Sequence, residues 1–327
     1  MPTMQAATYR RVGGPELVQI ERLPIPTPGA HEVLVRVHAS TVSVADHRAR
    51  SRDIPKGLRL LSSFALGVFR PRTPVLGMDA AGVVAAVGEK VTRFRPGDEI
   101  IAMLGGKFGG HAEYVLIPED GAITAKPGNM SFDEAVTLVF GGITARGFLN
   151  QVTIKPGDTV LVNGASGAVG TAMVQLVKQL GADVTGVCSA ANAELVKSLG
   201  ADRVIDYTTV DFLAEGTTYD VVVDCVGNAG FERAAASVKP GGALLLVICD
   251  LTGLLLASTR SRRSGKLVTA NVGPYKAEDL AFLVELAQAG QYRAVIDSTY
   301  ELDDIVSAHR YVDTGRKRGN VVVRMPA

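Results

Sequence analysis

The sequence predicts an α/β protein of two domains, one rich in antiparallel strands and the other built on a doubly wound parallel sheet. Its 327 residues are enough for two sizeable cores. Residues 4–118 contain short alternating apolar runs separated by Pro and Gly, a pattern typical of antiparallel strands. Residues 158–272 instead contain continuous runs of Val, Ile and Leu, as a parallel sheet covered on both faces requires.

The alternating runs of the first part are HEVLVRVHAS (31–40), DAAGVVAAVG (79–88) and DEIIAMLG (98–105). Residues 129–150 then follow a helical pattern, and Ser131 stands directly before the acidic Asp133 and Glu134, which is typical of a helix start. We therefore expect a helix over 129–150 that bridges the two domains.

Six apolar runs predict the strands of the parallel sheet, over residues 158–163, 183–188, 203–206, 219–227, 242–249 and 266–272. A helical segment (277–289) and a short tail that ends in GNVVVRMP follow them. This tail is too small for a core of its own and should return to the first domain. The predicted domains are residues 1–124, completed by 272–327, and residues 125–271.

Composition excludes several classes of function. With 34 basic and 33 acidic residues, the net charge of +1 gives no case for binding nucleic acid or an acidic membrane. The chain begins MPTMQAATYRR, without the apolar run of a signal peptide, so we expect a cytoplasmic protein. The apolar stretch 243–257 is too short for a membrane helix and predicts a core strand and the loop after it.

One stretch is unusually basic. Between His47 and Arg72 there are seven Lys or Arg residues and a single acid, Asp53. We interpret it as a solvated loop, with a lid over an anionic group as the alternative. A second basic segment, 251–266, contains TRSRRSGK and is expected to be a loop that shapes selectivity.

A glycine-rich turn follows the first parallel strand and opens a helical pattern. It reads A-x-G-x-x-G, a variant of the dinucleotide-binding turn: Ala165, Ser166, Gly167, Ala168, Val169 and Gly170. Gly167 would let the main chain approach a pyrophosphate, and Gly170 would let helix and strand pack closely. Gly181 predicts the end of the helix. Because the turn sits between a strand and a helix and begins the series of strands, it predicts nucleotide binding.

The end of the second parallel strand bears on the choice between NADH and NADPH. Sites that prefer NAD carry an acid there to hold the ribose 2′-hydroxyl, but this chain has CSAAN (188–192), with no carboxylate before Glu194. The loop also lacks Lys and Arg, so a 2′-phosphate would depend on neutral hydrogen bonds from Ser189, Asn192 and Tyr207. We expect NADPH, with NADH as the alternative.

With these features in place, the chain resembles the medium-chain dehydrogenase/reductase superfamily, in its zinc-free quinone oxidoreductase branch. The resemblance covers nearly the whole length. It rests on motifs that occur in the family's order, among them YRRVGGPELV, STVSVAD (40–46), PVLGMDAAGVVAAVG (74–88), HAEYVLIPE, GGITA (141–145), KPGDTVLVNGASGAVG, GADRVIDY and AHRYVDTGRKRGNVVV. It implies a GroES-like β domain formed by both chain ends, with an inserted Rossmann domain.

The resemblance also bears on metal binding. Metal-dependent relatives hold catalytic zinc through Cys and His at positions that match Ser43, Met78 and Gly141 here, and none of these can supply the N or S ligands that zinc favours. The lobe that binds structural zinc is missing as well, since no Cys precedes Cys188. Ala45 replaces the hydroxyl that begins the proton relay of those relatives. We therefore expect no zinc.

The activity that the resemblance implies is hydride transfer from NADPH to quinones or α,β-unsaturated carbonyls, whose conjugation already activates them. The β domain would contribute Ser43, Asp46 and Asp79 to the cleft, with the two acids expected to organise loops rather than act as acids. No catalytic acid is assigned; Tyr9 and His111 are expected to be a strand and a turn residue. The cofactor would contact Thr144, Val226, Ile248 and Asn320.

Two other functions remain open: an alcohol or ketone oxidoreductase of the same superfamily, and a cofactor-binding protein without catalysis. The family commonly dimerises through the edge of the Rossmann sheet, which is KLVTANV (266–272) here. We therefore expect a homodimer and a small electrophile as partners.

Overall fold

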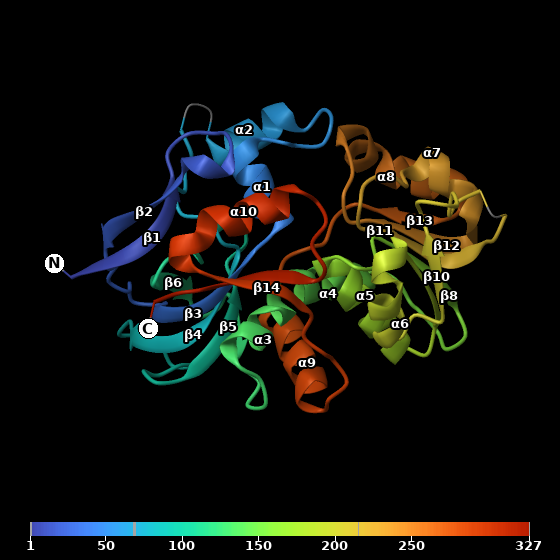
Figure 1. The fold of residues 1–327 in the computed structure, drawn as a ribbon. Coiled ribbons are helices and arrows are strands. Elements are labelled where there is room, and N and C mark those ends of the chain that lie inside the picture. Colours follow the sequence, from blue (N-terminus) through green and yellow to red (C-terminus); the bar gives the residue numbers. More distant parts are fainter. Residues whose placement is uncertain (1, 68–69, 215, 327) are drawn as a thin grey trace. The chain divides into compact units, whose positions relative to one another are not determined.

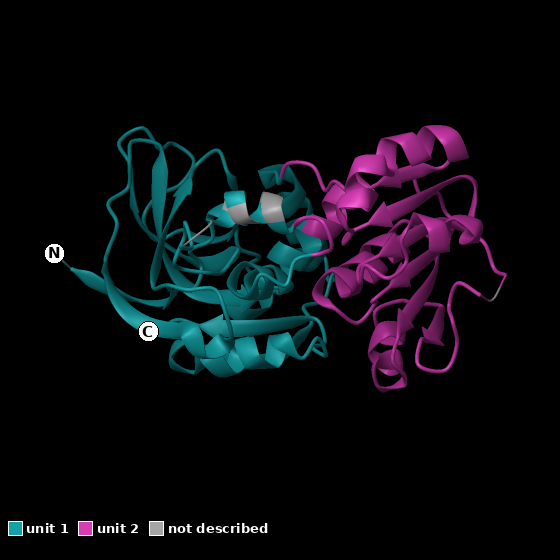
Figure 2. Cartoon of the chain, turned by 90° about the horizontal axis from the view of Figure 1, so that it is seen from above, with its two compact units in different colours: residues 1–54, 59–143, 275–327 teal, residues 55–58, 144–274 magenta. Residues whose placement is uncertain are grey.

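The computed structural model describes residues 2–67, 70–214 and 216–326 and divides into two compact units (Figure 2). Unit 1 comprises Met1–Ile54, Arg59–Ile143 and Tyr275–Ala327, and unit 2 comprises Pro55–Leu58 and Thr144–Pro274. The main boundaries therefore fall at 143/144 and 274/275, whereas the predicted domains were divided at 124/125 and 271/272.

The segment after residue 124 is tied to unit 1 by polar contacts. Lys126 pairs with Glu99 at 3.2 Å, and Asp133 pairs with Arg324 at 2.6 Å. Asn129 also donates a hydrogen bond to the main-chain oxygen of Ala287. These contacts explain why the segment packs with the first unit.

Unit 1 is built on a mainly antiparallel sheet of seven strands (Figure 1). The order is β14–β15–β3–β4–β5–β7, and β6 also pairs with β3. A separate hairpin joins β1 to β2. The last strand of the chain, β15, pairs antiparallel with β3, so the C-terminal segment completes the sheet. The strands are β1 (Thr3–Tyr9), β2 (Val18–Pro24), β3 (Glu32–Val42), β4 (Asp79–Val87), β5 (Glu99–Met103), β6 (Tyr114–Pro118), β7 (Ala122–Ala125), β14 (Ile296–Glu301) and β15 (Asn320–Arg324).

Residues 68 and 69 of the basic stretch lie outside the described residues. The described part, 47–67 and 70–72, is not a solvated loop, so that interpretation was wrong. It contains most of α1 (Val44–Ser51) and all of α2 (Arg59–Leu66). Arg50 is fully buried, and Arg52 is 9 % exposed and donates to the main-chain oxygens of Ser62 and Gly67. Two of the seven basic residues are therefore buried and hold neighbouring segments together through hydrogen bonds. Their charge alone did not predict this burial.

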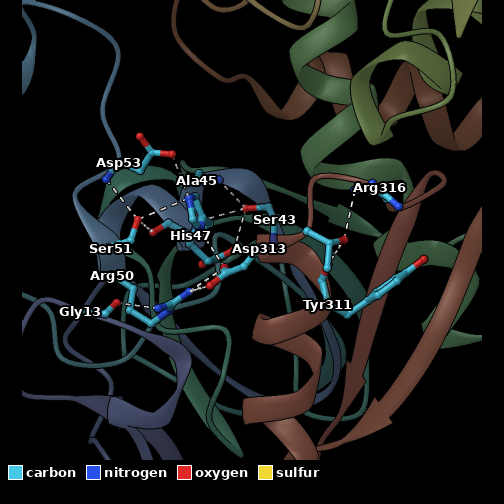
Figure 3. A network of polar contacts seen from close by, with 12 residues as sticks. Gly13, Ser43, Ala45, His47, Arg50, Ser51, Asp53, Tyr311, Asp313 and Arg316 are labelled. Atoms are coloured by element: carbon cyan, nitrogen blue, oxygen red, sulfur yellow. Dashed lines mark hydrogen bonds and ion pairs between the residues drawn. The ribbon is translucent and has the colours of Figure 1, made fainter. Parts of the chain in front are cut away.

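Arg50 joins α1 to α10 (Ile305–Asp313) through Asp313 (Figure 3). Its Nη2 lies 2.6 Å from both carboxylate oxygens of Asp313, and its Nη1 donates to the main-chain oxygen of Gly13 at 2.6 Å. His47 Nδ1 also lies 2.6 Å from Asp313 Oδ1. The Asp313 carboxylate thus neutralises the charge of the buried Arg50 guanidinium and links α1 to α10.

The predicted bridging helix starts as expected but is not continuous. Ser131 and Glu134 form a reciprocal capping box at the start of α3 (Phe132–Val136). A wide π-helical turn, Leu138–Ile143, then precedes α4 (Thr144–Leu149). Such turns often mark functional segments. The remaining helix of unit 1 is α9 (Ala277–Gln288).

Unit 2 confirms the doubly wound parallel sheet of six strands. The order is β10–β9–β8–β11–β12–β13, and every pairing is parallel. The strands are β8 (Thr159–Asn163), β9 (Asp183–Cys188), β10 (Arg203–Asp206), β11 (Tyr219–Asp224), β12 (Val238–Leu246) and β13 (Leu267–Thr269). The helices besides α4 are α5 (Ala168–Gln179), α6 (Ala193–Ser198), α7 (Phe231–Ala234) and α8 (Leu251–Ser264).

Helix α8 corrects the expectation of a loop over 251–266. Asp250 caps it by accepting the Gly253 amide at 2.7 Å. Three consecutive leucines, 254–256, are exposed, so the apolar residues of this helix do not follow a single buried face. Within the described ranges, none of the helices combines the length and the apolar character needed to span a bilayer.

Replacement of Asp313 by Ala should lower the free energy of unfolding by about 2 to 3 kcal/mol, because the buried Arg50 guanidinium loses its carboxylate. Urea unfolding would measure the change, with the exposed Asp303→Ala as the matched control. The double variant Arg50→Met/Asp313→Leu should recover most of the loss. Equal effects of Asp313→Ala and Asp303→Ala would contradict this account.

Candidate functional site

The glycine turn links β8 to α5 and depends on two glycines. Gly164 has a φ of +77°, a conformation that favours glycine. A Cβ on Gly170 would lie 2.0 Å from the main-chain oxygen of Gly164, so only glycine fits there. The turn therefore holds the start of α5 directly against the end of β8.

The N-terminus of α5 is open. Gly167 is its N-cap and provides no side-chain cap, and a Cβ on Gly167 would meet only the Gly164 oxygen, at 3.6 Å. The first amides of a helix have no intrahelical acceptor, and the helix dipole adds positive potential at this end. An anionic group such as a pyrophosphate fits this arrangement. Ala165 and Ala168 are buried below the turn.

The three polar residues expected beside the turn follow the carboxyl ends of β9 and β10. Asn192 Nδ2 lies 3.2 Å from Ser166 Oγ and 3.4 Å from Ser189 Oγ. Tyr207 follows β10 and is 59 % exposed. Its amide donates to the main-chain oxygen of Cys188, which precedes Ser189. The structure thus brings together Ser166, Ser189, Asn192 and Tyr207.

A carboxylate lies beside the end of β9 after all, and β10 supplies it. Asp206 pairs in register with Cys188. It accepts the Thr208 amide and hydroxyl at 2.9 and 2.7 Å, and its pKa is lowered chiefly by the hydrogen bond from the Thr208 amide. A search along the loop that follows the second strand misses this acid, since only strand pairing places it there.

Asp224 is a second residue that sequence reasoning missed. It is fully buried at the end of β11 and accepts the amides of Val226, Gly227 and Ala229 at 2.7 to 3.0 Å. Asn163 donates to the same carboxylate at 2.8 Å. An acid at the end of an apolar strand was the available signal.

The loop that Asp224 fixes carries one of the expected cofactor residues. Val226 is 49 % exposed, and its Cγ2 would meet a Cβ on Gly164 at 2.7 Å. Ile248 would meet a Cβ on Gly227 at 2.8 Å. Val226 and Ile248 therefore lie at the same edge of unit 2 as the glycine turn.

The last two cofactor candidates belong to different units. Thr144 opens α4 in unit 2, and its buried Oγ1 has no hydrogen-bond partner among the described residues. Asn320 lies in unit 1, where its Nδ2 donates to the main-chain oxygen of Val295 at 3.1 Å. An unpartnered buried hydroxyl is costly, so Thr144 fits a polar group that a cofactor would supply.

The three cleft candidates of unit 1 are buried and bonded locally. Ser43 caps α1 and donates to Asp46, which also accepts the Gly77 amide at 2.7 Å. Asp79 accepts the Thr41 amide at 2.7 Å and the hydroxyls of Thr41 and Ser40. Burial raises the pKa of Asp79 to about 7. Ser43 is 3 % exposed, and both acids are fully buried.

Tyr9 and His111 are buried too. Tyr9 ends β1, and burial raises its pKa. His111 Nε2 lies 3.0 Å from the main-chain oxygen of Thr41. Both residues pack inside unit 1.

The residues at the positions of the zinc ligands do not fit a zinc ion. Ser43 Oγ is shared with Asp46, Met78 offers a thioether, and Gly141 lies buried inside the π-helical turn. Zinc in proteins favours thiolate, imidazole and carboxylate ligands. Across the part of the chain that the structure describes, no cluster of three His, Cys, Asp or Glu residues is placed to hold a metal ion.

Comparison with known proteins identifies the family. Residues 29–127 match the alcohol dehydrogenase GroES-like domain, and residues 199–323 match the zinc-binding dehydrogenase family. The chain is 33 % identical to the chloroplastic quinone-oxidoreductase QR1 of Triphysaria versicolor, over 98 % of both sequences. It is 32 % identical to 2-methylene-furan-3-one reductase of Solanum lycopersicum, over 98 % of this chain and 79 % of that protein.

A solved structure of the same architecture is the quinone oxidoreductase from Coxiella burnetii. It superposes with a TM-score of 0.87 at 27 % identity and covers 99 % of this chain and 100 % of that one. The GroES-like and Rossmann assignments are therefore confirmed, and with them an NAD(P)-binding fold. The chain belongs to the medium-chain dehydrogenase/reductase superfamily, in its quinone oxidoreductase branch.

Proposed function

We propose that the protein is a reductase that uses NADPH to transfer hydride to quinones or α,β-unsaturated carbonyls and needs no zinc. The open N-terminus of α5 above Gly167 carries this proposal, because it offers main-chain amides to a pyrophosphate without an obstructing side chain. A reduced nicotinamide supplies the hydride when bound. Ser166, Ser189, Asn192 and Tyr207 would contact the adenosine end of the cofactor, and Thr144, Val226, Ile248 and Asn320 would contact the rest.

The class of acceptor follows from the relatives and from the site chemistry. Two relatives are named for a quinone and for a methylene-furanone, which are conjugated and poor in electrons. Hydride addition to such a compound leaves a delocalised oxyanion that a few hydrogen-bond donors can stabilise. This supports reduction without the Lewis acid that an alcohol oxidoreductase uses.

The proton that completes the reduction would come from water. Ser43, Asp46 and Asp79 are buried and hold main-chain amides, so we assign them to positioning. A quinone that gains the hydride and a proton becomes a hydroquinone, with both hydrogens on oxygen, whereas an enone gains the hydride at its β-carbon and the proton at its α-carbon. Each reduction transfers two electrons, which the reduced nicotinamide supplies.

Assembly and location stay predictions. Strand β13 is one of the two edge strands of the six-stranded sheet, and an unpaired edge suits pairing with a second copy. A homodimer through β13 and a cytoplasmic location would both agree with the proposed reductase.

Purified protein should oxidise NADPH in the presence of benzoquinones, naphthoquinones or short alkenals, and a chelator should not slow the reaction. Absorbance at the nicotinamide band measures turnover, with NADH in parallel. Stoichiometric zinc that turnover requires would overturn the metal-free proposal. NADPH binding without oxidation by any acceptor would instead indicate a binding protein.

Two glycine variants separate folding from cofactor binding. Gly167→Ala should leave the unfolding free energy nearly unchanged but weaken NADPH binding about tenfold, because its methyl group faces the pyrophosphate position. Gly170→Ala should lose about 1 to 3 kcal/mol of stability through its clash with Gly164. Calorimetry would measure the NADPH affinity of each variant, and urea unfolding would measure its free energy of unfolding. Normal NADPH affinity in Gly167→Ala would place the cofactor elsewhere.

Thr144→Val removes the unpartnered hydroxyl and should not reduce stability. It should weaken NADPH binding by about 1 kcal/mol if the cofactor is the missing partner of Oγ1. A loss of stability with unchanged NADPH affinity would show that the hydroxyl serves the fold alone.

A further inference from the structure

A hollow of about 330 Å³ lies in unit 2 between the segment after β10 and the start of α7. Its lining includes Tyr207, Thr208, Asp211, Asn228 and Arg233. Of these, Tyr207 and Thr208 were described above, beside the end of β9. The lining also contains the positively charged Arg233. The sequence alone did not assign this residue to the cofactor site.

The two sides of the hollow, at Asn228 and at Tyr207, are hydrogen-bonded to the carboxyl ends of β8 and β9. Asn228 Oδ1 accepts Asn163 Nδ2 at 2.6 Å, where β8 passes into the glycine turn. On the other wall, the Tyr207 amide donates to the oxygen of Cys188 at the end of β9. Arg233 therefore belongs to the same edge of the sheet as the nucleotide-binding turn.

Arg233 is oriented but remains accessible. Its Nη2 lies 2.6 Å from Asp211 Oδ1, its Nη1 donates to the main-chain oxygen of Asn228 at 2.8 Å, and its guanidinium lies over the Phe212 ring at 5.3 Å. The Arg233 side chain is 43 % exposed and that of Asp211 is 48 % exposed. An ion pair this exposed contributes little, so another anion can replace the carboxylate at small cost.

The cofactor brings such an anion. The loop of residues 189–192 contains no Lys or Arg, and the Asp206 carboxylate beside it already accepts hydrogen bonds from Thr208. A phosphate monoester binds best to a guanidinium, which can donate two parallel hydrogen bonds. We propose that Arg233 recognises the 2′-phosphate of NADPH and that Asp211 holds the guanidinium in place until the phosphate replaces it. This inference rests on the proposed NADPH-dependent function.

Binding constants of four nucleotides test the inference. Calorimetry would compare NADPH with NADH, and 2′,5′-ADP with 5′-AMP, for the wild type, Arg233→Gln, Arg233→Lys and the control Arg262→Gln. Arg262 is an exposed arginine on α8, so its variant has the same change of net charge. Arg233→Gln should weaken NADPH and 2′,5′-ADP by about tenfold or more, and NADH and 5′-AMP by less than about twofold. Arg233→Lys should fall between, and Arg262→Gln should match the wild type.

The outcomes separate this inference from the proposed function. Failure of the wild type to bind either dinucleotide would reject the proposed function itself. Equal losses for NADPH and NADH in Arg233→Gln, or no loss, would overturn the role of Arg233 alone. A wild type that prefers NADH, with NADH weakened by Asp206→Asn, would show that Asp206 holds the ribose 2′-hydroxyl instead. Circular dichroism of each variant confirms its fold.

Discussion

The close approach of α5 to β8 is the constraint on which the nucleotide-binding edge depends. Gly170 touches the main chain at Gly164 so closely that no side chain fits between them. This contact aims the free amides of the α5 N-terminus along the end of the sheet, where the strands adjacent to β8 also end. Because the donors are main-chain groups on packed elements, their direction does not depend on side-chain rotamers. The open Gly167 then leaves space for an anion at the same place.

Buried and half-buried carboxylates give the loops around this turn their shape. Asp224 accepts three loop amides after β11, and Asp206 accepts the amide of the turn after β10. A carboxylate can accept several hydrogen bonds at once, so one residue satisfies main-chain groups that a loop would otherwise leave unpaired. These hydrogen bonds fix the loop that contains Val226 after β11 and the turn that contains Thr208 after β10. Charge at these strand ends thus serves the structure of the loops.

Unit 1 uses its polar residues in a similar way. The position that holds a zinc-ligating cysteine in metal-dependent relatives carries Ser43, and the Ser43 hydroxyl caps α1 together with Asp46. Asp313 fixes the other end of α1 through the buried Arg50. Asp79 joins β4 to β3 through Thr41, and its raised pKa reflects how completely it is buried. The polar side chains of Ser43, Asp46 and Asp79 therefore serve local structure.

The sequence by itself determined the fold class, the six parallel strands, the glycine turn and the capped start at Ser131, because local spacing and backbone conformation dictate these features. It did not reveal α8, whose exposed leucines break the helical pattern, or the π-helical turn that interrupts the expected bridging helix. Only the tertiary structure decided which charges are buried, as Arg50 shows, and which lie beside the end of β9, as Asp206 shows. The physical reason is that strand pairing and helix packing join residues far apart in the chain, and no local pattern encodes those distances.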